Sequence, residues 1–188
     1  MPMVTVQYPK GALTPDQKAR LAEDMTHVLL VIEGGQDTPA TRSNAWVRFQ
    51  AIDPEDWYVG GANDGAYVSA AGKFLVELNV PEGSMDQLRK SEAHKAITAA
   101  FLKVTGTTTV EGAARSVWIQ IFEWPEGLLA TSGRTSSLLG IAKLAGIPSD
   151  HPLLSFPRAY FAAKDRLYDA HGFPEHTAGR SLVRVESV

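Results

Sequence analysis

The sequence repeats itself at a spacing of 72 residues, and this repeat constrains the fold more than any other feature. Proline, glycine and tryptophan recur at equivalent positions of the two copies, as Pro9 and Pro81, Gly11 and Gly83, and Trp46 and Trp118. Thr14 and Asp86 are also equivalent, and both are residue types that favour the N-cap of a helix. The repeat therefore predicts two structural units with the same order of elements.

Each copy is predicted to contain a strand, a helix and a second strand. The predicted strands are residues 4–8 and 45–52 in the first copy and residues 74–80 and 116–123 in the second. The segment Thr14-Pro15-Asp16-Gln17 combines an N-cap, a proline at the first helical position and a glutamine that can close a capping box. A helical crossover of this length returns the second strand parallel to the first. Each copy is thus a β-α-β unit.

We therefore predict an α+β fold, in which tandem β-α-β units form a four-stranded sheet with two helices on one face. Residues 1–61 form the first unit, 62–72 a linker rich in Gly, Ala, Asn and Asp, and 73–134 the second unit. Residues 135–188 form a helical C-terminal extension, and its predicted elements are helices at 136–145 and 157–170 and a strand at 181–185. This extension covers either its own core or a neighbouring subunit.

Composition excludes several classes of function. The 188 residues include no cysteine, which excludes disulfides, a thiol nucleophile and a Cys-based zinc site. The five histidines lack metal-site spacing, so we expect neither a metal nor a cofactor. The net charge of −3 comes without long charged runs, and no apolar segment approaches the ~20 residues of a membrane span. We expect a soluble cytoplasmic protein that binds neither nucleic acid nor membrane.

Proline at position two has two interpretations. If Met1 is removed, Pro2 carries a free secondary amine, and burial in an apolar site lowers the pKa of that amine toward neutrality, where it can act as a base. Alternatively, Pro2 only starts a strand, where its missing N–H costs no hydrogen bond of the sheet. Position alone favours the second interpretation.

Several short motifs together resemble the tautomerase superfamily. These are Pro2 ahead of a β-α-β unit, the Leu13-Thr14-Pro15 turn, Met25-Thr26 in the helix, and the segment Trp57-Tyr58-Val59-Gly60-Gly61. The fused pair of units resembles longer members, such as cis-3-chloroacrylic acid dehalogenase and malonate semialdehyde decarboxylase, over residues 2 to about 134. The resemblance implies one tautomerase-like domain, a homotrimer, no cofactor, and catalysis by Pro2 as general base or acid.

Four further side chains are candidates for substrate binding. Arg48 on the second strand can bring a positive charge near Pro2 if its face of the strand lines the pocket. The resemblance places Trp57 where short members have an aromatic residue over the proline, and Arg134 in a Gly-Arg dipeptide that can bind a carboxylate. Gln120 can donate a hydrogen bond to a substrate oxygen. Each also has an ordinary structural role available, as a surface, hairpin or loop residue.

Other positions depart from the pattern of the family. Arginines of the short members would fall at Ala12 and Trp46, and those of the dehalogenases at Pro81 and Ser84. These departures argue against dehalogenation and favour a cofactor-independent tautomerase that acts on a small, anionic oxo acid or enol. A decarboxylase, hydratase or dehalogenase of a small unsaturated or oxo acid is the second hypothesis. A non-catalytic assembly or binding protein is the third.

Overall fold

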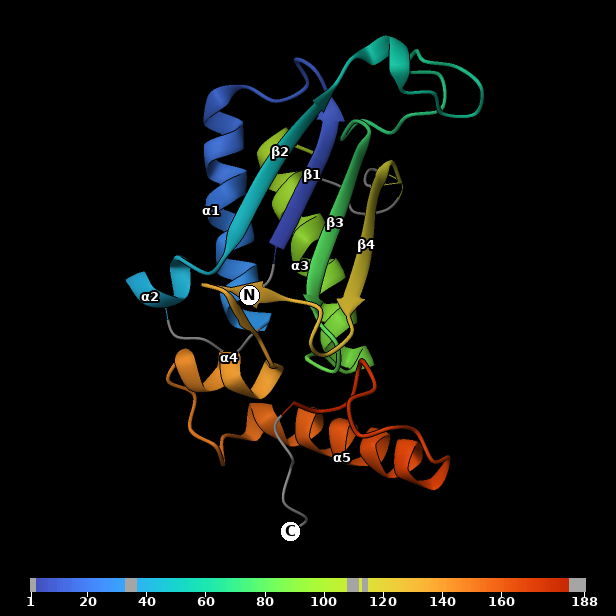
Figure 1. Cartoon of the computed structure of the whole chain (residues 1–188). Coiled ribbons are helices and arrows are strands. Elements are labelled where there is room, and N and C mark those ends of the chain that lie inside the picture. Colours follow the sequence, from blue (N-terminus) through green and yellow to red (C-terminus); the bar gives the residue numbers. More distant parts are fainter. Residues whose placement is uncertain (1–2, 33–36, 108–111, 113–114, 183–188) are drawn as a thin grey trace.

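The computed structural model describes residues 3–32, 37–107, 112 and 115–182, and its centre is a four-stranded sheet (Figure 1). The strands are β1 (Met3–Pro9), β2 (Trp46–Ile52), β3 (Phe74–Pro81) and β4 (Val117–Trp124), in the spatial order β2-β1-β3-β4. Each outer strand runs parallel to its inner neighbour, and the two inner strands, β1 and β3, are antiparallel. This arrangement confirms the predicted α+β sheet of tandem β-α-β units.

Two long helices cover one face of the sheet (Figure 1). They are α1 (Pro15–Ile32) and α3 (Gln87–Thr105). The backbone N–H of Gln17 donates to Thr14 Oγ1 at 3.2 Å, and the N–H of Thr14 donates to Gln17 Oε1 at 2.9 Å, which is the predicted capping box. At the start of α3, the Asp86 carboxylate accepts from the backbone N–H of Arg89 at 2.8 Å. Equivalent positions of the repeat thus begin both helices.

The hydrophobic core lies between these helices and the sheet. Alternate residues of the two inner strands point into it, namely Val4, Val6, Tyr8, Phe74, Val76, Leu78 and Val80. The helices contribute Leu21, Met25, Leu29, Ile97 and Phe101, all fully buried. Full burial of one such side chain stabilises the fold by ~1.5–3 kcal/mol, so the alternation fixes which face of each strand turns inward.

The opposite face of the sheet carries exposed side chains. Trp46 is 53% exposed and Trp118 is 66% exposed. Each indole N–H donates to the carbonyl oxygen three residues earlier, in Ser43 and in Arg115, at 3.1 Å in both cases. The repeat therefore extends to individual hydrogen bonds. The two tryptophans therefore do not belong to the core of the chain.

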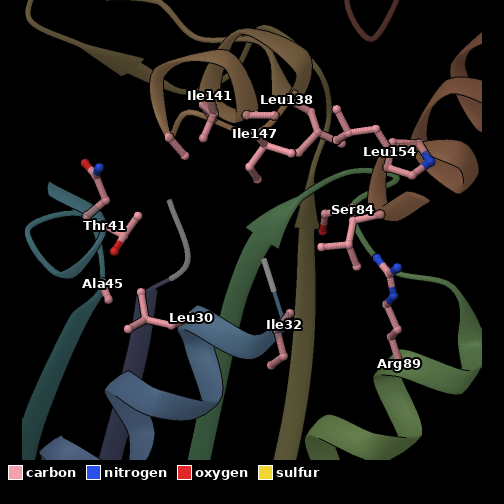
Figure 2. A pocket seen from close by; sticks show the side chains of 15 residues that line it. Leu30, Ile32, Thr41, Ala45, Ser84, Arg89, Leu138, Ile141, Ile147 and Leu154 are labelled. Carbon is pink, nitrogen blue, oxygen red and sulfur yellow. The ribbon is translucent and has the colours of Figure 1, made fainter. Parts of the chain in front are cut away.

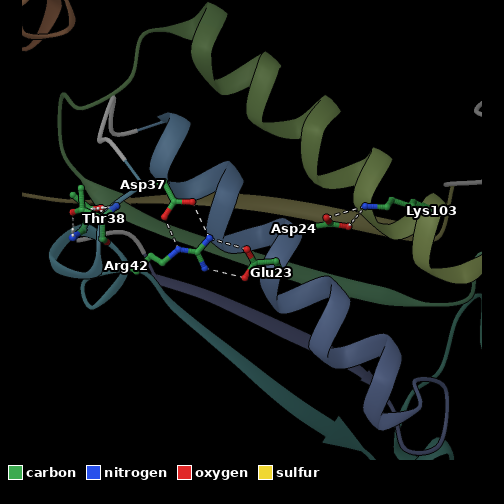
Figure 3. Close-up of polar contacts among 7 residues, drawn as sticks. Glu23, Asp24, Asp37, Thr38, Arg42 and Lys103 are labelled. Carbon is green, nitrogen blue, oxygen red and sulfur yellow. Dashed lines mark hydrogen bonds and ion pairs between the residues drawn. The ribbon is translucent and has the colours of Figure 1, made fainter.

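Charged side chains at the surface join the helices (Figure 3). Arg42, in the short helix α2 (Pro39–Arg42), donates to both carboxylate oxygens of Glu23 and also contacts Asp37. Lys103 of α3 pairs with Asp24 of α1 at 2.9 Å. Exposed ion pairs contribute little to stability because water screens them, so these contacts orient α2 more than they stabilise the fold.

The C-terminal extension lies at the end of the sheet where β1 begins (Figure 1). It contains α4 (Leu138–Leu144) and α5 (Ser155–Ala170), which confirm the two predicted helices. A hairpin of β5 (Ala130–Thr131) and β6 (Arg134–Thr135) precedes them and was not predicted, nor were α2 and the short 3₁₀ helices Pro54–Asp56 and Pro152–Leu154. Residues 183–188 lie outside the described residues, and with them most of the strand predicted at 181–185.

Across the described ranges, no helix is long and apolar enough to cross a membrane. Within those same ranges, no group of three or more His, Asp or Glu side chains is arranged to hold a metal ion.

Candidate active site

An apolar pocket lies at the end of the sheet where β1 begins, between the two units and the C-terminal extension (Figure 2). Its volume is about 50 Å³. Leu30 and Ile32 at the end of α1 and Ala45 just before β2 form one wall. Residues of α4 and of the segment that leads into α5 form the facing wall. The pocket exists because the extension packs over an end of the sheet that would otherwise be open.

Among the residues that the structure describes, two polar side chains at one side of the pocket have no hydrogen-bond or ion-pair partner. Arg89 is the one charged residue among the described residues that line the pocket, and its guanidinium makes no hydrogen bond or ion pair with any of them. Ser84 Oγ is buried and likewise has no hydrogen-bond partner within the described part of the chain. Figure 2 shows the Arg89 side chain rising from α3 toward Ser84. The Arg89 side chain is half-buried, whereas Ser84 Oγ is buried, and buried polar groups are nearly always paired, so the two together mark a place where a ligand oxygen would be bound.

The pocket is close to the start of the first strand. Met3 pairs with Trp46 on one side and with Asn79 on the other, and Ala45, the residue before Trp46, lines the pocket. Pro2, the residue bonded to Met3, lies outside the described residues. The prediction that its amine is catalytic therefore stays a prediction.

Two of the predicted binding residues share one row on the exposed face of the sheet. The register pairs Arg48 with Thr5, Thr5 with Glu77, and Glu77 with Gln120. Arg48 Nη2 donates to Thr5 Oγ1 at 2.9 Å. Arg48 and Gln120 therefore stand at opposite edges of the face that points away from the helices, and neither lines the pocket.

The other two predicted residues also lie away from the pocket. Trp57 follows β2 at the far end of the sheet, where its carbonyl oxygen accepts a hydrogen bond from Lys73 Nζ at 2.6 Å. Arg134 is exposed in the β5–β6 hairpin. Sequence reasoning missed Arg89, because an arginine in the first turn of a helix has no distinguishing pattern. Ser84 had a signal, since it occupies a position where the dehalogenases have an arginine.

Glu82, directly after β3, anchors the extension. Its Oε1 accepts hydrogen bonds from the Tyr160 hydroxyl and from Lys164 Nζ, each at 2.5 Å, and its Oε2 accepts from the Glu126 N–H at 3.3 Å. Burial alone would raise the pKa of Glu82, but the hydrogen bonds from Lys164 and Tyr160 and the Lys164 charge outweigh it and hold the pKa below its ordinary value. Burial, and then the contact with Glu82, raise the pKa of Tyr160. These contacts, which include the ion pair between Lys164 and Glu82, hold α5 against the second unit.

Glu126 performs the same task for α4. This side chain is 5% exposed, and its Oε2 accepts a hydrogen bond from the backbone N–H of Leu138, the first residue of α4, at 3.1 Å. Burial raises the pKa of Glu126 despite the backbone hydrogen bonds that it accepts. Glu82 and Glu126 together place α4 and α5 over the pocket.

Comparison with known proteins identifies the fold. No family profile matches the sequence, and no curated protein matches it. Among solved structures, it is similar to a fused 4-OT that forms an asymmetric trimer, with 15% identity, a TM-score of 0.59, and coverage of 73% of this chain and 98% of the other. It is also similar to N1, a member of the cis-3-chloroacrylic acid dehalogenase family, with 16% identity, a TM-score of 0.57, and coverage of 89% and 99%.

A third similar structure is macrophage migration inhibitory factor of Toxoplasma gondii, with 15% identity, a TM-score of 0.54, and coverage of 71% of this chain and 99% of the other. These neighbours are tautomerase-superfamily members. The chain therefore has the fused tautomerase-superfamily fold, as the sequence motifs had implied. At such identities the likeness shows the fold and leaves the activity to be argued from the site.

Proposed function

We propose that the chain is a cofactor-independent tautomerase that acts on a small anionic oxo acid or its enol, with Pro2 as general base and acid. The observation that carries the proposal is the apolar pocket beside the start of β1, with the unpaired Arg89 at one side. A secondary amine in apolar surroundings stays neutral near ambient pH, which suits a base that must remove a weakly acidic proton. The fold adds support, because its neighbours include catalytic members of the superfamily.

The proposed reaction moves one proton. Neutral Pro2 removes a proton from the carbon next to the substrate carbonyl, and the electron pair of that C–H bond forms the C=C bond of an enolate. The protonated amine then returns the proton to the enolate oxygen, which gives the enol. The reverse sequence gives the oxo acid, so neither direction needs another reactant. Arg89 would bind the substrate carboxylate through two N–H groups, and the Ser84 hydroxyl would donate to a substrate oxygen.

Replacing Arg89 by methionine tests the assignment of the carboxylate site. We expect KM for pyruvate to rise about 10- to 100-fold, with a smaller change in kcat, because a charged hydrogen-bond pair is lost from substrate binding. The measurement is the exchange of the pyruvate methyl hydrogens in D₂O, followed by NMR. Arg20→Met removes the same charge from an exposed position of α1 and should leave KM unchanged. Equal effects of the two variants would contradict the assignment.

We also propose that three chains assemble through the exposed face of the sheet. Fused 4-OT structures similar to this chain are trimers, and that face exposes Trp46, Trp118 and Phe122 around the row that contains Arg48 and Gln120. Sedimentation should give three times the mass of the 20.3-kDa chain. Trp118→Arg should give single chains, whereas Tyr67→Arg, at a 64% exposed position of the loop between β2 and β3, should remain trimeric. A wild-type monomer would exclude this assembly.

A further inference from the structure

The C-terminal extension forms the greater part of the pocket wall, and it does so with hydrocarbon side chains. Leu138 and Ile141 of α4 and Leu154 before α5 point toward the pocket from the side opposite α1 (Figure 2). We propose that this wall selects the substrate, and that the pocket takes 2-oxo acids whose tail is a short, branched alkyl group. This inference rests on the proposed function, because it names the substrate class of the same site.

Charge argues for a substrate with one carboxylate. Arg89 and Ser84 lie together at one side, and no second cation lines the pocket among its described residues. The carboxylate of a monoacid can be bound there. The second carboxylate of a dicarboxylate would then face Leu138 and Ile141, where it would lose its hydration without gaining a partner. The wall therefore discriminates against dicarboxylic oxo acids.

Size argues for a small tail. The cavity measures about 50 Å³, whereas a cavity that binds benzene measures roughly 150 Å³ and a single water needs ~10–15 Å³. An isopropyl group fits such a space, and a phenyl ring does not fit without displacement of the wall. Displacement is costly because Glu82 and Glu126 fix the two helices that form the wall.

Hydrogen exchange at carbon 3 in D₂O measures removal of the proton next to the carbonyl, and it can be compared among different 2-oxo acids. We expect the highest kcat/KM for 3-methyl-2-oxobutanoate, about tenfold above pyruvate, because two more buried carbons contact the wall. Phenylpyruvate and oxaloacetate should both be slower than 3-methyl-2-oxobutanoate. A preference for oxaloacetate or for phenylpyruvate would overturn the inference.

A pair of variants on α4 locates the selectivity. Ala142 is 5% exposed and lines the pocket, whereas Leu144, two residues later, is 83% exposed. Ala142→Leu should fill the space for the tail and remove the advantage of 3-methyl-2-oxobutanoate over pyruvate, while Leu144→Ala should preserve it. An unchanged ratio in Ala142→Leu would assign selectivity to another part of the molecule and overturn the inference.

A binding measurement separates this inference from the proposed function. Calorimetry with 3-methyl-2-oxobutanoate and pyruvate, on the wild type and on Ala142→Leu, reports the tail contact without any turnover. If 3-methyl-2-oxobutanoate binds more tightly than pyruvate but neither acid exchanges hydrogen, the pocket has the stated preference and the tautomerase proposal fails. If exchange occurs with no dependence on the tail, the tautomerase proposal stands and the selectivity does not.

Discussion

A chain that begins at Pro2 is expected to exchange the pyruvate methyl hydrogens, and a chain that retains Met1 is expected to do so at least 100-fold more slowly. Met1 converts the proline nitrogen into a tertiary amide, which cannot take up a proton, and general base catalysis typically contributes 10²–10⁴-fold. Intact mass spectrometry identifies the two forms, and NMR in D₂O gives their rates. Equal rates would exclude Pro2 as the base.

The pH dependence identifies the group. The base is the neutral amine, so kcat/KM should rise with pH until the amine is deprotonated and then level off. An α-amino group normally has a pKa of about 7.7–8.0, and an apolar pocket lowers it, so the plateau should be reached below that value. Pro2→Ala provides the matched control, because its primary amine also titrates but is held less rigidly. The exchange rate of Pro2→Ala should fall between that of the wild-type chain that begins at Pro2 and that of the wild-type chain that retains Met1.

Gly83→Ala is expected to be among the most destabilising single substitutions of a turn residue in this protein. Gly83 has φ +72°, where an L side chain costs ~1–2 kcal/mol. An added Cβ would also lie 2.6 Å from Cδ1 of Tyr160, and such overpacking costs a further ~1–3 kcal/mol. Because Tyr160 donates to Glu82, the clash acts directly on the contact that anchors the extension. Urea denaturation measures the loss.

The repeat supplies the control for this substitution. Gly11 is the equivalent residue of the first unit, with φ +88°, and nothing lies within 4 Å of a Cβ added there. Gly11→Ala should therefore cost the backbone strain alone. Gly83→Ala, but not Gly11→Ala, should also expose the extension to limited proteolysis. Equal losses in the two variants would mean that Tyr160 moves away at no cost.

Local signals in the sequence were sufficient to predict the sheet and its helices. Thr14 and Asp86 are caps whose hydrogen bonds involve residues three positions away, so their geometry depends on short segments alone. Strand direction followed from the length of each crossover. The hairpin of β5 and β6 was missed, although Ser132 and Gly133 both have positive φ, because Ser-Gly is a weaker turn signal than Asn-Gly.

The pocket could not be predicted, because it depends on contacts between distant parts of the chain. Glu82 and Lys164 are 82 residues apart, and nothing in either local sequence indicates that they pair. Arg89 lines the pocket only because the extension packs beside it. The four predicted binding residues were chosen from strand period and family likeness, which indicate a face or a position but not the walls of a cavity formed by a segment outside the repeat.

The two units have equivalent backbones, but they carry opposite charges in the turn that follows the first strand of each unit. They also differ in the residue that precedes or begins that strand. Lys10 occupies the position of Glu82 and pairs with Asp53, so the cation of α5 that binds the second unit would be repelled by the first. Phe74 occupies the position of Pro2, and its nitrogen is an internal amide that donates to the Ser116 carbonyl. The two units therefore share a backbone, whereas Glu82 of the second unit, and not Lys10 of the first, carries the charge that holds the C-terminal extension.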